Sequence, residues 1–241
     1  MLPTERTMSR RGLHVALTAQ SVVVILVSVN RLAPITLTPV PPYEFLRLVE
    51  LNNMVLALFS LIVSYALIAR LGAAVPHGAS PASLIRGVVF MVGAYLFALS
   101  YGNHEVTNYL NARFCPPRAG GEICDIVRFH DDEVSHLLFF AGFTIINLSV
   151  MAAQWAHPTS SPLSRSDRVL STGNGLVVAA GIMANLAFET IGFDLYVVAA
   201  VAVTAVVLHL RRPGQLILWY YAIAYPAGFV ATLAVKALGA D

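Results

Sequence analysis

The sequence predicts an all-α integral membrane protein: a single bundle of seven transmembrane helices, with a cytoplasmic N-terminus and an exoplasmic C-terminus. Of the 241 residues, 57% are hydrophobic and only 12% are charged, and the mean hydropathy is +0.72. Soluble domains carry about 25% charged residues, so this chain has too little polar surface to cover a globule in water. Seven apolar runs have the length that a bilayer core of about 30 Å requires. No repeat or Gly/Ser linker divides residues 1–241, which predicts one domain.

The first four runs are bounded by charged residues or by proline and glycine. The first begins deep in charge and is followed by no small-residue cleavage site, so it is interpreted as a helix and not as a signal peptide. The expected spans are Leu13–Asn30, Asn52–Leu71, Val88–Tyr109 and Glu133–Ala153.

The last three runs are bounded in the same way, and the expected spans are Gly175–Thr190, Leu195–Leu210 and Leu216–Ala237. The sixth span has only sixteen residues, and a span that short can tilt little in the bilayer. Pro226 lies inside the seventh and predicts a kink in that helix.

The distribution of charges predicts the orientation, because cytoplasmic loops retain lysine and arginine. With the N-terminus inside, the inner segments hold nine arginines and two acids, whereas the outer segments hold six basic residues and eleven acids. This asymmetry predicts a bacterial inner (plasma) membrane protein with a negatively charged outer face. No basic stripe interleaved with aromatic residues occurs, so a nucleic-acid partner is not expected.

The only two cysteines, Cys115 and Cys124, lie in the outer loop between the third and fourth spans. An oxidising exterior would allow them to form a disulfide bond, and two unpaired thiols remain the alternative. Such a bond would restrict the entrance to the fourth span.

Polar residues collect at the outer ends of the spans. Three of the seven histidines, His104, His130 and His136, lie there on the third and fourth spans, together with Glu105 and with the acids Asp132, Glu133 and Glu189. In a regular helix Asp132 and Glu133 share a face with His136, because they are four and three positions away from it. Acids at a helix N-terminus also have a purely structural reason to occur there.

This inventory favours a divalent metal site, with zinc as the first choice, because zinc binds imidazoles and carboxylates and activates bound water. The expected ligands are His104, His130 and His136, with Glu133 or Asp132 as a fourth ligand or as the base that orients water. Ser100 is a candidate to stabilise an oxyanion, Glu189 to support the ligands, and Glu105 to join the catalytic groups.

The motifs restrict the choice of enzyme. His104-Glu105-Val106-Thr107-Asn108 has asparagine where a zinc protease has its second histidine, and the second Glu-x-x-His that a di-iron site needs is missing. Ser100-x3-His104 is similar to the serine and histidine pair of the seven-helix zinc amidases that include the alkaline ceramidases and the adiponectin-receptor group. The His-x3-His pair of that family's last helix is absent from Leu216–Ala237, and the chain is not assigned to the family.

The preferred hypothesis is a metal-dependent membrane hydrolase whose substrate, a lipid or another amphiphile, enters near the outer leaflet. One alternative is a cation or proton transporter with an acidic outer vestibule. The other is a metal-free membrane cyclase or isomerase that acts on an isoprenoid-like substrate through acid and base residues.

Overall fold

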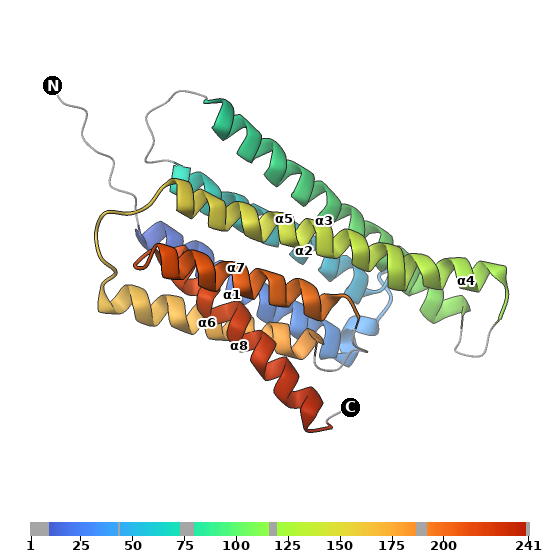
Figure 1. Cartoon of the computed structure of the whole chain (residues 1–241). Coiled ribbons are helices and arrows are strands. Elements are labelled where there is room, and N and C mark those ends of the chain that lie inside the picture. The colour runs from blue at the N-terminus through green and yellow to red at the C-terminus, as the bar shows by residue number, and fades with distance from the viewer. Residues whose placement is uncertain (1–9, 43, 73–79, 116–119, 187–191, 240–241) are drawn as a thin grey trace.

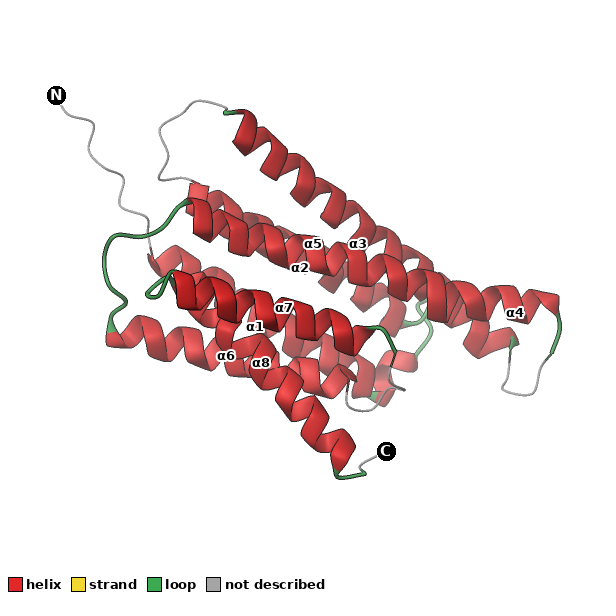
Figure 2. Ribbon diagram, in the orientation of Figure 1, coloured by secondary structure: helices red, strands yellow, loops and turns green. Residues whose placement is uncertain are grey.

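The structure, a computed structural model, describes residues 10–42, 44–72, 80–115, 120–186 and 192–239. It is 86% helical, and the described residues contain no strand (Figure 2). Seven of its helical segments are long and apolar enough to cross a membrane. The predicted helical class and number of spans are therefore confirmed, and the architecture is that of an integral membrane protein.

The elements follow one another as α1 (Arg10–Leu32), the 3₁₀-helix η1 (Pro34–Leu37), α2 (Leu48–Gly72), α3 (Pro81–Phe114), α4 (Glu122–Arg128), the π-helix η2 (Phe129–Val134), α5 (Ser135–Ala156), α6 (Arg165–Leu186), α7 (Asp194–Arg211) and α8 (Leu216–Ala237). The last helix has the predicted bounds. The largest difference concerns α3, which has 34 residues. At a rise of 1.5 Å per residue it is about 50 Å long, well beyond the hydrocarbon core.

The seven long helices lie side by side, and α1 begins and α8 ends at opposite ends of the bundle (Figure 1). At one end α4 and the last turns of α3 project beyond the other helices. This end is called the α4 end below, and the opposite end, where α1 begins, is called the Arg10 end. The overhang accounts for the five residues that α3 gains after Tyr109, because this end forms a helical hairpin with α4; seven further residues precede Val88 at the start of α3.

The core joins α1, α5, α6, α7 and α8 through buried side chains such as Leu17, Met151, Val201 and Ile217. Helix α6 makes its most extensive contacts with α8, and α3 makes its most extensive contacts with α5. Large apolar side chains also cover the outside of the bundle; Met91 is 70% exposed, for example. Such surface is stable in contact with lipid chains, so the bundle is built to lie in a bilayer.

Two glycines bring α3 and α5 into backbone contact. A Cβ atom on Gly142 would lie 2.5 Å from the backbone nitrogen of Phe97, and one on Gly93 would lie 2.7 Å from Cγ2 of Ile145. The helices are antiparallel, and His104 lies eleven residues after Gly93 while Asp131 lies eleven residues before Gly142. The close crossing therefore places these two polar residues at the same level.

Polar groups gather at two levels of the bundle. Arg10 and Asn30 lie at opposite ends of α1, and their separation of twenty positions corresponds to about 30 Å, the thickness of the hydrocarbon core. Asn30 donates to Asn53 at 2.8 Å, and Asn53 donates to Glu105 at 3.1 Å. This second polar level thus passes through α1, α2 and α3 at one membrane boundary.

A candidate active site at the α4 end

The segment that carries the predicted histidines and acids is a π-helix, η2, inserted between α4 and α5. Its hydrogen bonds reach back five residues: the backbone N–H of Ser135 donates to the carbonyl of His130. That carbonyl also accepts hydrogen bonds from Oγ of Ser135 at 2.7 Å and from Nδ2 of Asn103 at 2.9 Å. π-Turns recur at functional sites because they re-aim side chains without ending the helix.

The π-turn changes which acid faces the bundle. A regular helix was expected to place Asp132, Glu133 and His136 on one face; the structure instead buries Asp131, which is 4% exposed, and leaves Asp132 and Glu133 exposed. The extra residue in the turn rotates the segment, so Asp131 points toward α3. The buried acid of the turn is thus Asp131, which is outside the predicted ligand set, whereas the predicted Asp132 and Glu133 lie at the surface.

Asp131 lies against His104 of α3, with Oδ1 of the carboxylate 2.9 Å from Nδ1 of the ring. The two atoms are close, but their geometry is not that of an aligned hydrogen bond. Thr107 also donates to Oδ1 of Asp131 at 3.1 Å. The histidine side chain is 35% exposed, so its other nitrogen, Nε2, remains open to a ligand.

His136 stands beside His104, and the ring centroids are 5.7 Å apart. Two imidazoles that bind one zinc ion through Zn–N bonds of about 2 Å have ring centres about 5–6 Å apart, so this spacing suits a shared ion. His130 is exposed, and its ring packs edge-on against Phe129 instead. The structure thus brings two of the three predicted ligands together.

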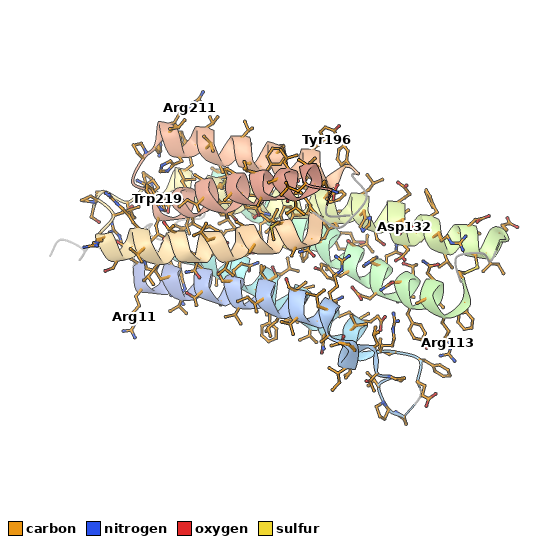
Figure 3. All side chains as sticks on the ribbon, turned by 90° about the horizontal axis from the view of Figure 1, so that it is seen from below. Arg11, Arg113, Asp132, Tyr196, Arg211 and Trp219 are labelled. Carbon is orange, nitrogen blue, oxygen red and sulfur yellow. A yellow bond between two sulfur atoms is a disulfide. The ribbon has the colours of Figure 1, made fainter. Side chains whose placement is uncertain are left out.

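No group of three or more His, Cys, Asp or Glu side chains in the described part of the chain is arranged to hold a metal ion. The two rings alone therefore do not make up a metal site. Asp132 and Glu133 lie on the exposed side of η2 (Figure 3 labels Asp132).

Ser100 connects the two helices below this pair. It is 3% exposed, and its hydroxyl donates to the carbonyl of Ser135 at 2.8 Å. Asn103 adds a second bridge by donating to Oγ of Ser135 at 2.8 Å. Both residues support the π-turn that positions Asp131.

Glu105 lies next to His104 in the chain but faces α2. It is 1% exposed; Oε1 accepts a hydrogen bond from Asn53 at 3.1 Å, and Oε2 has no hydrogen-bond partner. Glu189, the remaining predicted site residue, lies outside the described residues.

A cavity of about 170 Å³ lies below the histidine pair in the middle of the bundle. Tyr101 and Phe139 line it. Tyr101 precedes His104 on α3 and Phe139 comes after His136 on α5, so each lies about one helical turn closer to the centre of the bundle than its histidine. Its wall is mostly apolar. Among its polar lining residues, Tyr221 and Tyr225 both donate their hydroxyls to Oδ1 of Asn147, at 2.9 and 2.7 Å. Gln20, Ser60, Ser64 and Asn185 are further polar residues of the wall.

Sequence reasoning missed the roles of Asp131, Asn103, Thr107 and Ser135. A polar position every third or fourth residue along α3, from Ser100 through Asn103 to Thr107, was the available signal for that helix. No comparable signal marks η2, because the π-turn depends on contacts between the helices.

No protein-family model, curated protein or solved structure matches the chain.

Proposed function

We propose that the chain is a membrane-embedded, metal-dependent hydrolase that acts on a lipid or another amphiphile, with the metal, zinc as the first choice, held at the α4 end. The observation that carries the proposal is the pair of rings, His104 and His136, at a spacing of 5.7 Å, with the buried Asp131 against the far nitrogen of His104. A carboxylate in that position is the usual outer partner of a metal-bound histidine, because it fixes the ring and increases its basicity.

The proposed ligands are Nε2 of His104 and the ring of His136, and a third comes from Asp132 or Glu133 on the adjoining turn. Catalytic zinc sites use three protein ligands of this kind and keep a position open for water. Such an ion lowers the pKa of bound water to about 7. A small rotation of the π-turn would be required to bring the third carboxylate to the ion.

The cavity below the pair supports an amphiphilic substrate. Its wall is mostly apolar and begins at Tyr101 and Phe139, close to the two histidines. When the polar bond of such a substrate lies at the histidines, the apolar chain of the same substrate lies in the cavity, where it is removed from water. A substrate entering from the surrounding lipid fits this geometry better than one arriving from water.

We further propose that the α4 end faces the outside of a bacterial inner membrane and that the N-terminus is cytoplasmic. The charge asymmetry of the loops supports this orientation. The disulfide bond between Cys115 and Cys124 supports it as well, because such bonds persist in oxidising compartments. Single cysteines introduced at the exposed Glu122 and Arg211 test the orientation: an impermeant maleimide added to intact cells should label the first and not the second.

The metal proposal is tested by elemental analysis of purified protein. The wild type should carry about one divalent ion per chain, and His104→Ala and His136→Ala should each lose it, because two remaining ligands bind weakly. His157→Ala, in the loop at the Arg10 end, is the matched control and should retain the ion. A wild type without metal, or variants with unchanged metal content, would contradict the proposal.

A metal-free acid–base enzyme acting on an isoprenoid-like amphiphile is the second candidate, and the His104–Asp131 pair favours it specifically. A buried carboxylate that orients a histidine is the arrangement by which enzymes prepare a general base. Turnover of extracted membrane lipids by the purified protein separates the two candidates. Exhaustive chelation abolishes turnover by a metal enzyme and leaves turnover by the histidine pair intact.

A further inference from the structure

A second pocket, of about 330 Å³, lies on the other side of α3, between the α1–α2 loop and the overhanging end of α3. Phe45, Met54, Tyr109 and Phe114 supply most of its apolar wall, and Glu105 and Arg113 are its charged residues. It shares no lining residue with the cavity in the middle of the bundle. The pocket therefore requires an explanation separate from the histidine pair.

The base of the pocket holds a carboxylate whose hydrogen bonds are incomplete. Glu105 is 1% exposed, and its Oε2 has no hydrogen-bond partner, whereas Oε1 accepts from Asn53. Burying a carboxylate without a cationic partner costs free energy. Such side chains are retained where a ligand supplies the missing hydrogen bonds. Oε2 is buried as well as unpartnered, so a ligand in the pocket reaches it only by displacing the side chains that cover it, and a positively charged donor would satisfy it best.

The mouth of the pocket carries the opposite charge. Arg113 is exposed, and its guanidinium lies 5.6 Å from the ring of Phe45, 5.7 Å from that of Tyr109 and 5.5 Å from that of Phe114. It donates to the carbonyl of Glu44 at 3.0 Å and to the hydroxyl of Tyr109. No carboxylate of the described residues pairs with Arg113, so its charge is available to an anion.

Glu105 and Arg113 both line the pocket from α3, eight residues apart in the sequence. The Arg113 side chain turns back toward Tyr109, which lies one turn or about 6 Å beyond Glu105 along the helix axis. Glu105 lies at the level of Asn30 and Asn53, where the hydrocarbon core ends. The pocket thus begins at the membrane boundary and extends into the headgroup layer.

We propose that this pocket binds the headgroup of a zwitterionic phospholipid that has a primary ammonium, with the ammonium donating to Glu105 and the phosphate against Arg113. A primary ammonium is required because a quaternary one has no hydrogen to donate to Oε2. The phosphate suits the planar, multiply donating guanidinium. This inference is independent of the proposed hydrolase, because it uses neither the histidines nor a metal.

The experiment uses the full chain, purified after exchange into vesicles that contain equal amounts of phosphatidylethanolamine and phosphatidylcholine, and counts retained lipids by native mass spectrometry. The wild type should retain phosphatidylethanolamine at least fivefold over phosphatidylcholine. Glu105→Gln should reduce that ratio to about one, and Arg113→Gln should reduce the retention of both lipids. Equal retention of the two lipids by the wild type overturns the proposal, and so does an unchanged preference in Glu105→Gln.

Two matched controls show that the effect is local. Glu122→Gln removes an exposed acid on α4, and Arg211→Gln removes an exposed arginine at the Arg10 end, so both should keep the wild-type ratio. Circular dichroism confirms that every variant remains helical. A headgroup source other than lipid is examined with free phosphoethanolamine: binding of the free compound without retention of the lipid overturns the assignment to a phospholipid.

Discussion

Asp167 at the Arg10 end and Glu105 at the α4 end are both buried, but only Asp167 is paired with a cation. Glu50, which precedes Asn53 on α2 and is also fully buried, is paired with Arg47. At the Arg10 end, Oδ2 of Asp167 receives Arg10 at 2.7 Å and the N–H and hydroxyl of Ser164 at 2.9 and 2.8 Å, while Oδ1 lies 2.8 Å from Nε2 of His14. At the α4 end, Glu105 has one asparagine contact and an open oxygen. Asp167 is neutralised by residues of the protein itself. Glu105 has no cationic hydrogen-bond partner among the described residues, so a ligand would have to provide one.

The position of each acid in its helix reinforces this difference. Ser164 and Asp167 form a capping box at the start of α6, because Oγ of Ser164 also accepts from the backbone N–H of Asp167 at 3.1 Å. Glu105 lies within α3, far from either helix end. Asp167 therefore has a sufficient structural role, whereas burial without a cationic partner makes Glu105 a candidate functional residue.

Replacing Asp167 by asparagine should produce the largest effect on stability. The substitution leaves the Arg10 guanidinium without its anion at a position where it is mostly buried, which costs about 3 kcal/mol. Thermal unfolding in detergent measures the loss. Asp125→Asn is the control, because Asp125 is 72% exposed and its distance to Arg128 is 3.8 Å. Equal losses in the two variants would mean that Asp167 does not hold α1 to α6.

Gly142→Ala should come second, and it acts on the α4 end. The new Cβ would meet backbone atoms of α3, which cannot rotate away as a side chain can, so α3 and α5 must separate at a cost of about 2 kcal/mol. The separation should also remove His104 from Asp131. Unfolding in detergent and metal content measure the two effects.

The control for that substitution is Gly173→Ala on α6, where a Cβ would meet nothing within 4 Å. It should be neutral or slightly stabilising, because alanine has a higher helix propensity than glycine. If Gly142→Ala behaves in the same way, the close crossing does not position the site.

The features that could be predicted from the sequence are those that follow from the bilayer itself. A span needs about 20 apolar residues, so composition alone located all seven helices, and the last one, Leu216–Ala237, has its predicted bounds. The pairing of Cys115 with Cys124 was expected from the compartment and is confirmed. Both arguments depend on the surroundings of the chain and not on contacts between helices.

The site could be predicted only in part, because it depends on such contacts. The level of His104 and His136 follows from counting residues, and the structure brings these two together. The burial of Asp131 in place of Asp132 follows from the π-turn, which Asn103 and Ser135 stabilise through a single carbonyl. A sequence read at 100° per residue contains no information about that insertion.

A smaller effect is expected when both cysteines are replaced by serine. The disulfide bond joins the end of α3 to α4, a helix that buries none of its residues in the bundle. Its loss should loosen the hairpin and change the global stability by less than about 1 kcal/mol, because the hairpin unfolds locally. Hydrogen exchange should accelerate in Glu122–Arg128 and stay unchanged in Arg165–Leu186. Acceleration in both helices would show that the bond stabilises the whole bundle.

Glu105→Gln should produce the smallest effect on stability and is the sharpest test of the comparison. A neutral amide keeps the shape of the side chain and removes a buried charge that has no ion pair among the described residues, so the unfolding free energy should stay within about 0.5 kcal/mol of the wild type or rise. Asp167→Asn makes the same chemical change at the other end and should cost about 3 kcal/mol. The difference between the two changes in unfolding free energy shows whether the charge of Glu105 stabilises the fold, as that of Asp167 does, or serves a ligand. Equal destabilisation would make Glu105 a structural acid like Asp167, and the headgroup pocket would lose its anion.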